Sequence, residues 1–93
     1  LAGIPTSIKD LTSTKGIRST RGSLVMQDLV PDYDPPLVER LYDAGIVMLG
    51  KSSTPEFGWK GETTNRISGT TRNPWNLEKT PGGSSGGAGR APA

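Results

Sequence analysis

The sequence predicts an α/β fold, and three consecutive segments carry that prediction. Residues 4–8 alternate apolar or β-branched side chains with Pro5 and Ser7, which is the period-two pattern of a strand. Residues 35–44 place apolar side chains at helical spacing, and residues 46–49 are a continuous apolar run between two glycines. A strand, a helix and a second strand in this order predict a β-α-β unit with parallel strands and a right-handed crossover.

The first predicted strand begins beside a proline and ends at a lysine. Pro5 has no backbone N–H, which favours the start of a strand or the edge of a sheet. Lys9 follows at the carboxyl end, where open α/β sheets commonly place functional groups. The alternative is a solvated surface lysine, which is the usual fate of this residue type.

The clearest helix start in the chain is the stretch Asp32–Pro36. Asp34 is predicted to cap the helix, and Pro35 is tolerated at the first helical position because its missing N–H has no intrahelical partner. One apolar face follows, made by Leu37, Val38, Leu41 and Tyr42. Gly45 is predicted to end the helix. The next run, Ile46–Leu49, is typical of a strand buried on both faces of a parallel sheet.

Two long segments, residues 11–30 and 51–79, are predicted to be mostly loop. The first is rich in Thr, Ser, Gly and Arg, with a short helical turn expected at residues 24–28. A loop-rich segment as long as the second is usually functional or disordered, and its aromatic residues argue against disorder. These aromatic side chains are expected to pack rather than to contact a substrate: Phe57, Trp59 and Trp75.

Length and composition allow one domain at most and exclude several function classes. The 93 residues are 31% apolar and include no cysteine and no histidine, so the core is thin and lacks disulfides, thiolate ligands and imidazoles. We therefore expect no metal site and no cofactor. The net charge of +2 is spread along the chain without a basic run among aromatics, which argues against a nucleic-acid surface. No apolar run is long enough to span a membrane and no signal-peptide pattern is present, and the absence of cysteine fits the expected cytoplasmic location.

The most distinctive stretch is the glycine-rich loop Thr80–Gly87, in which four glycines flank Ser84 and Ser85. Glycine permits positive φ and close backbone approach, so the two hydroxyls are expected to be presented by the backbone. A helix is expected to open at Gly86, although Pro92 is expected to end or kink it. Two other interpretations stay open, namely a flexible Gly/Ser linker and a non-catalytic anion-binding loop.

Taken together, the segments of this chain resemble the amidase signature family. The matching pieces cover essentially the whole chain in family order: Gly3-Ile4-Pro5, Ile8-Lys9-Asp10, Lys15-Gly16-Ile17, Ala44-Gly45-Ile46-Val47, Gly50-Lys51, Pro55-Glu56-Phe57, Gly69–Trp75 and Thr80–Gly87. The resemblance implies a partial amidase-signature fold, in which helices cover a mixed β-sheet. Residues 1–93 would be the N-terminal part of one incomplete domain, with its β-α-β portion and its glycine/serine loop.

The same resemblance implies a Ser–cisSer–Lys triad that hydrolyses a carboxamide C–N bond through an acyl-enzyme. By position, Lys9 is the base and Ser84 is the bridging serine, which follows a cis peptide bond. The nucleophilic serine of the family lies further along than Ala93, so we expect this segment by itself to be inactive. The resemblance also implies four supporting residues in the glycine-rich loop, namely Gly82, Gly83, Ser85 and Gly86. Gly58 would line the pocket for the acyl group of the substrate.

A lysine serves as a base only when it is neutral. Its ordinary pKa is about 10.4, and lowering it by ~3 units requires ~4 kcal/mol of preference for the neutral amine, supplied mainly by burial. We therefore expect Lys9 to be desolvated and hydrogen-bonded to Ser84. A carboxylate in contact would favour the charged amine, so we expect Lys9 not to be tightly paired with Asp10.

Two functions within the family remain open, and each implies different partners. One is a free-standing amidase for a small-molecule amide, and the other is the A-type component of a glutamyl-tRNA amidotransferase. The stretch Thr54–Trp59 resembles the former more closely. Unpaired strand edges invite association, so we expect contact with the remainder of the enzyme or with a second copy. No direct contact with nucleic acid or a membrane is expected.

Overall fold

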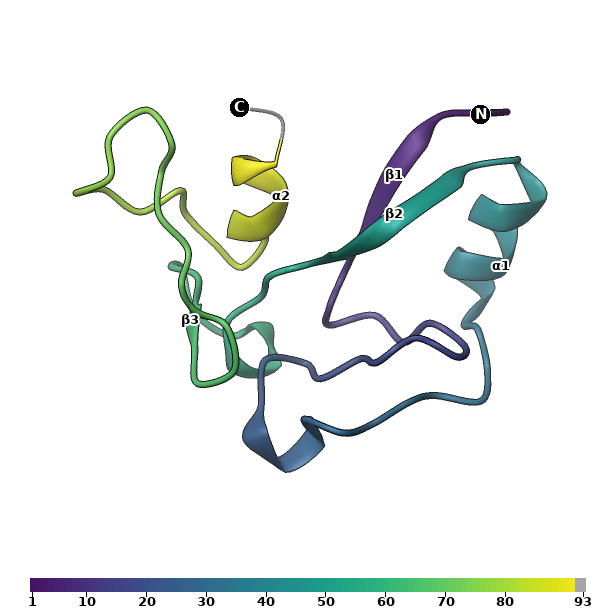
Figure 1. Cartoon of the computed structure of the whole chain (residues 1–93), viewed down its shortest axis with the longest axis horizontal. Coiled ribbons are helices and arrows are strands. Elements are labelled where there is room, and N and C mark those ends of the chain that lie inside the picture. Colours follow the sequence, from purple (N-terminus) through teal and green to yellow (C-terminus); the bar gives the residue numbers. More distant parts are fainter. Residues whose placement is uncertain (92–93) are drawn as a thin grey trace.

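The computed structural model describes residues 1–91, and a parallel pair of strands lies at its centre. β1 (Pro5–Lys9) pairs with β2 (Val47–Ser52), and α1 (Pro36–Asp43) lies between them in the chain. Figure 1 shows α1 beside the amino end of β2, with long loop segments along the lower and left parts of the view. The predicted α/β class and the strand–helix–strand order are therefore confirmed.

The pairing of β1 with β2 sets which side chains share a face. A register shift after Thr6 leaves Leu49 as an extra residue in β2. Beyond this bulge Ile8 pairs with Lys51, so these two side chains share one face of the pair. Lys9, which follows Ile8, projects from the other face. The two lysines at this end of the strands are thus separated by the sheet itself.

The ends of α1 depend on a pair of prolines and on a glycine. The predicted cap at Asp34 is wrong, because its Oδ1 accepts from the Lys15 backbone N–H at 2.7 Å. Pro35 is the N-cap instead, with extended φ and ψ of −67° and 158°. The residue before a proline avoids helical angles, so Pro36 delays the start by one position. The predicted end is confirmed, since Gly45 follows the helix with φ of +87°.

The apolar core lies between α1 and one face of the β1–β2 pair. It consists of three buried side chains and two partly buried ones packed against them: Ile8, Val38, Ile46, Leu41 and Met48. Val47 and Leu49 remain 49% and 70% exposed, so the expected burial of this strand on both faces is not found in the described residues. The reason is that α1 covers only one face and no large apolar side chain comes from α2.

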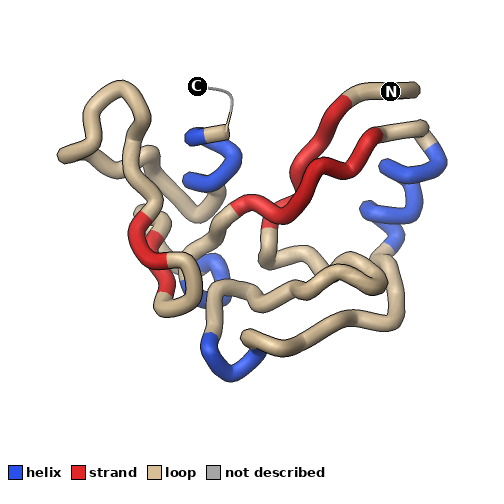
Figure 2. Tube along the Cα trace, viewed as in Figure 1, coloured by secondary structure: helices blue, strands red, loops and turns tan. Residues whose placement is uncertain are grey.

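The remaining elements are short, and Figure 2 shows that loops connect them over most of the chain. They are η1 (Leu24–Met26), η2 (Glu56–Gly58), β3 (Thr64–Asn65), β4 (Gly69–Thr70) and α2 (Gly86–Arg90). The expected helical turn and the expected helix from Gly86 are both present, while Pro92 lies outside the described residues. β3 and β4 form an antiparallel pair of their own, so the described sheets are one parallel and one antiparallel pair. Among residues 1–91, no helix has the length and apolar character needed to cross a bilayer.

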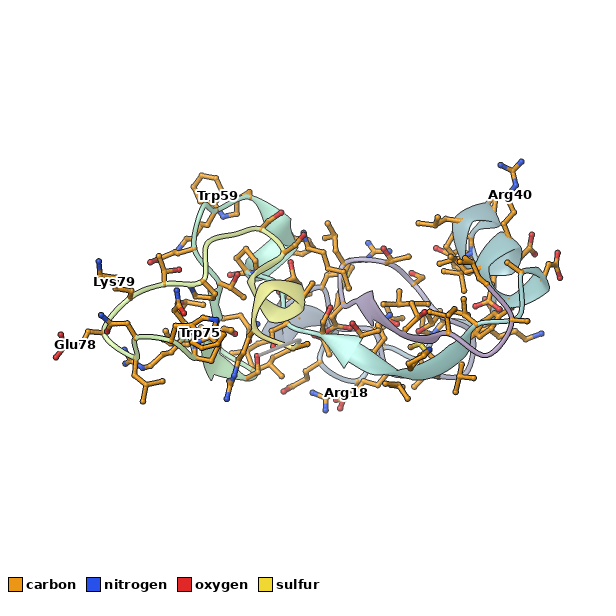
Figure 3. The ribbon with its side chains drawn as sticks, turned by 90° about the horizontal axis from the view of Figure 1, so that it is seen from above. Arg18, Arg40, Trp59, Trp75, Glu78 and Lys79 are labelled. Carbon is orange, nitrogen blue, oxygen red and sulfur yellow. The ribbon has the colours of Figure 1, made fainter. Side chains whose placement is uncertain are left out.

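Three aromatic side chains of the long second loop are exposed in the described structure. Phe57, Trp59 and Trp75 are 48%, 78% and 87% exposed, so the expectation that they pack is wrong for these residues. Figure 3 shows the Trp59 ring standing clear of the ribbon, and Trp75 lying on the outer loop near Glu78 and Lys79. The core between α1 and the sheet lies on the other side of the molecule and offers these rings no apolar surface.

Candidate active site

Lys9 and Ser84 meet at the carboxyl end of β1. Lys9 is the last residue of that strand, and its Nζ donates to Ser84 Oγ at 2.7 Å and to Ser85 Oγ at 3.1 Å. The peptide bond between Gly83 and Ser84 is cis. Figure 1 shows α2, which directly follows the two serines, beside the carboxyl ends of the strands. The structure therefore brings together the lysine and the serine that the sequence singled out, although 75 positions separate them.

The surroundings of Lys9 lower the pKa of its amine. Partial burial lowers the pKa of its amine below the ordinary value of 10.5. Both of its partners are hydroxyls, which can accept from an ammonium and can also donate to a neutral amine. The Asp10 carboxylate is engaged elsewhere, because Thr20 donates to it through its backbone N–H at 3.1 Å and through its hydroxyl.

Three glycines explain how the loop brings Ser84 to the lysine. Gly82 has φ of +87°, a region in which other residues are strained. A Cβ on Gly83 would come within 2.9 Å of Glu62 N, and a Cβ on Gly86 within 2.2 Å of Thr63 Oγ1. Real Cβ atoms do not come that close to other heavy atoms, so the loop follows this path only with glycine at both positions.

The other two predicted site residues have different surroundings. Ser85 stands at the N-cap of α2 but makes no side-chain cap hydrogen bond, and its hydroxyl accepts from Lys9 instead. Gly58 ends η2 with φ of +71°, where a Cβ would come within 2.8 Å of Leu11 Cδ2. Its place in an acyl pocket stays a prediction.

Lys51 is a second partly buried lysine that the sequence did not single out. Its amine donates to three oxygens of one loop: Thr12 O, Thr14 Oγ1 at 3.0 Å and Ser19 Oγ at 3.1 Å. Burial lowers the pKa of Lys51, whereas the negative charges of Asp10 and Asp34 raise it. Three acceptors match the three N–H groups of an ammonium, so Lys51 fastens this loop to the sheet. In the sequence it stands out only as part of the family-matching pair Gly50-Lys51, which does not indicate this role.

Thr63 is the other residue near the site that the sequence did not reveal. It lies just before β3, is buried, and contacts the glycine-rich loop through its hydroxyl. A threonine in a polar loop gives no sequence signal of such a contact. Among the described residues, no three His, Cys, Asp or Glu side chains are grouped so that they could hold a metal ion.

Comparison with known proteins shows the family of this chain. A family model described as Amidase matches residues 1–93. The chain belongs to the amidase signature family. Its fold and its ordered motifs thus agree with the family that the sequence resembles.

Curated relatives of this amidase-family chain include components of a larger enzyme, the glutamyl-tRNA(Gln) amidotransferase. The chain is 52% identical over 91 residues to the A-type component from Sulfurisphaera tokodaii, covering 98% of this chain and 19% of the relative. It is 46% identical over 93 residues to the corresponding component from Acidothermus cellulolyticus, covering 100% of this chain and 18% of that relative. The chain thus spans about a fifth of the length of the curated relatives it matches.

Solved structures of the family match the described fold closely. The structure superposes on the A-type component of the Thermotoga maritima amidotransferase with a TM-score of 0.88 at 40% identity, covering 95% of this chain and 20% of that one. For 6-aminohexanoate cyclic dimer hydrolase the TM-score is 0.90 at 42% identity, and the match covers 97% of this chain and 19% of the hydrolase. For the peptide amidase of Stenotrophomonas maltophilia it is 0.90 at 38% identity, covering 98% and 20%.

Proposed function

We propose that this chain supplies the base half of an amide-hydrolysing site, with Lys9 as the general base and Ser84 as the proton relay. The observation that carries the proposal is the 2.7 Å contact between Lys9 Nζ and Ser84 Oγ. It joins a lysine whose amine is partly desolvated to a hydroxyl that can donate and accept at once. The ordered family motifs support the same assignment.

In the proposed reaction a proton passes from the Ser84 hydroxyl to the Lys9 amine and later returns along the same contact. A serine from another part of the enzyme attacks the amide carbonyl, and its proton passes to Ser84 as the Ser84 proton passes to neutral Lys9. The tetrahedral intermediate then loses the amine, which takes the proton back along the same path. Water then attacks the resulting ester and its proton passes through Ser84 to Lys9. The proton returns to the departing serine oxygen as the carboxylic acid is released, so base, relay and nucleophile regain their starting states.

The proposed substrate class is a small carboxamide. Among the solved relatives, one is named a cyclic dimer hydrolase and another a peptide amidase, whereas the curated relatives are components of an amidotransferase. The second candidate function is therefore that of the A-type component of a glutamyl-tRNA amidotransferase, favoured by the 52% identity to one. Measuring ammonia released from glutamine against hydrolysis of simple aryl and alkyl amides distinguishes the two.

The test of the base and relay uses the full-length protein that carries these residues. Lys9→Ala and Ser84→Ala are each expected to lower kcat/KM for the amide by about 100-fold or more, since a positioned acid–base group contributes 10²–10⁴-fold. Lys79→Ala removes an exposed lysine and is the matched control, with unchanged activity expected. Full activity in Lys9→Ala, with circular dichroism matching the wild type, would contradict the proposal.

The 93-residue chain alone is expected to be inactive. It brings the base and the relay together but contributes no nucleophile in the proposed reaction. Incubating the purified chain with a fluorogenic amide checks this expectation. Turnover that disappears in Ser84→Ala would show that these residues suffice and that the assignment of the nucleophile to another part is wrong.

A further inference from the structure

The Thr63 side chain forms a bridge across the loop that carries the relay serine. Its hydroxyl donates to Gly82 O at 3.0 Å and accepts from Gly86 N at 3.0 Å. Gly82 and Gly86 lie two residues before and two residues after Ser84. One hydroxyl therefore holds both ends of the turn that presents the Ser84 side chain to Lys9.

The bridge lies in a closely packed and anchored place. Thr63 is 1% exposed, so no water competes freely for its hydroxyl. Its backbone carbonyl accepts from Thr71 N at 2.9 Å, and nearby Asn65 donates from Nδ2 to Thr54 O at 2.7 Å. The bridge is thus built on the β3–β4 pair and its neighbours, and not on the loop that it holds.

Close packing prevents the loop from moving toward Thr63 but not away from it. The space for a Cβ on Gly86 is already filled by the Thr63 hydroxyl and its Cβ, at 2.2 Å and 2.7 Å. Motion in the opposite direction is opposed by the two hydrogen bonds of the bridge. These bonds therefore resist displacement of the loop that carries Ser84.

We propose that Thr63 is a positioning residue for the reaction, which holds the relay serine in register with the base through its hydroxyl. The inference rests on the proposed function of Lys9 and Ser84. The hydrogen bonds of the Thr63 hydroxyl go to the backbone of Gly82 and Gly86 and not to Lys9, so Thr63 acts through that backbone. Its loss should therefore slow the chemical step and leave substrate binding largely unchanged.

The test compares three variants in the full-length protein with a small amide as substrate. Thr63→Val keeps the shape and removes both hydrogen bonds, and it is expected to lower kcat about 10- to 100-fold, since a misplacement near 1 Å costs about 10²-fold. KM is expected to stay within about twofold. Thr63→Ser retains the hydroxyl and is expected to restore most of kcat. Thr64→Val, in β3 beside it, is the matched control and is expected to behave as wild type.

The outcomes distinguish failure of the positioning role of Thr63 from failure of the proposed function of Lys9 and Ser84. A wild-type kcat in Thr63→Val would overturn the proposed positioning role of Thr63. A Thr63→Ser variant as slow as Thr63→Val would overturn it too. A loss confined to KM also overturns it. If Thr63→Val does not fold, Thr63→Cys replaces it, and a kcat equal to that of Thr63→Ser is then the contrary result. Full activity in Lys9→Ala and Ser84→Ala rejects the proposed function whatever Thr63 does.

Discussion

Lys9 and Lys51 are neighbours in the β1–β2 pair but differ in what their amines contact. Lys51 donates to the carbonyl oxygen of Thr12, a group that only accepts, and to two further hydroxyls. This set suits an ammonium. Lys9 has two hydroxyl partners and no carbonyl, so its neutral form keeps its hydrogen bonds. The partners of the two amines, and not the residue type, therefore distinguish the proposed base Lys9 from the structural cation Lys51.

The proposed role of Lys9 as base predicts how activity depends on pH. The base must be neutral, so kcat/KM should rise with pH as the amine loses its proton. Burial lowers the pKa of Lys9, which places the midpoint of this rise below 10.5. Steady-state kinetics of the full-length protein across pH check the midpoint, and Lys79→Ala should leave it unchanged. A rise centred at pH 10.5 or above would contradict a desolvated base.

At the scale of elements, the β1–α1–β2 unit is built from strong local signals. Pro35 and Pro36 fix where the helix begins, and Gly45 fixes where it ends. The helix then buries a single residue completely, namely Val38, against the sheet. The packing of this one side chain connects the helix to the strand that ends in Lys9.

The contribution of Val38 to stability can be measured against its neighbour. Val38→Ala removes buried methyl groups and is expected to lower the free energy of unfolding by about 2 kcal/mol. Leu37→Ala, at a position that is 60% exposed, is expected to cost less than about 0.5 kcal/mol. Urea denaturation followed by circular dichroism gives both values. Equal costs at the two positions would show that the helix packs on the sheet in another orientation.

At the scale of the whole molecule, the described residues bury few apolar side chains and expose many. The strand pair has α1 on one face only, and Leu49 lines an open cleft of about 520 Å³ between the other face and α2. Both edges of a two-stranded sheet also carry unpaired backbone groups. In relatives about five times longer, more chain is present to cover such surfaces.

The open face predicts that the 93-residue chain associates when it is studied alone. We expect its sedimentation coefficient to rise with concentration, because exposed apolar faces and strand edges pair with one another. Leu49→Lys should reduce this association by placing a charge on the open face. Gln27→Lys adds the same charge at an exposed position outside the sheet and should not reduce it. A wild-type chain that stays monomeric at every concentration would contradict the prediction.

The helix and strands of the β1–α1–β2 unit are predictable from the sequence, whereas the surroundings of individual side chains are not. The period-two strand and the helix bounded by proline and glycine are local patterns, so they can be predicted from the sequence alone. Asp34 failed as a cap because its carboxylate binds Lys15, far from it in the chain. The exposed Trp59 and Trp75 failed as packing residues because residue type does not say which surface lies opposite.

The sequence by itself determined the fold class and the glycine loop, because backbone preferences are properties of the chain. The pairing of Lys9 with Ser84 was implied by the resemblance of the ordered motifs to the amidase signature family. Only the tertiary structure decided which lysine also donates to a carbonyl oxygen, which face of the sheet is covered, and that the Thr63 hydroxyl spans the serine loop. Each of these depends on which groups, distant in sequence, come within hydrogen-bonding or van der Waals distance. Such distances arise from packing, which no local pattern encodes.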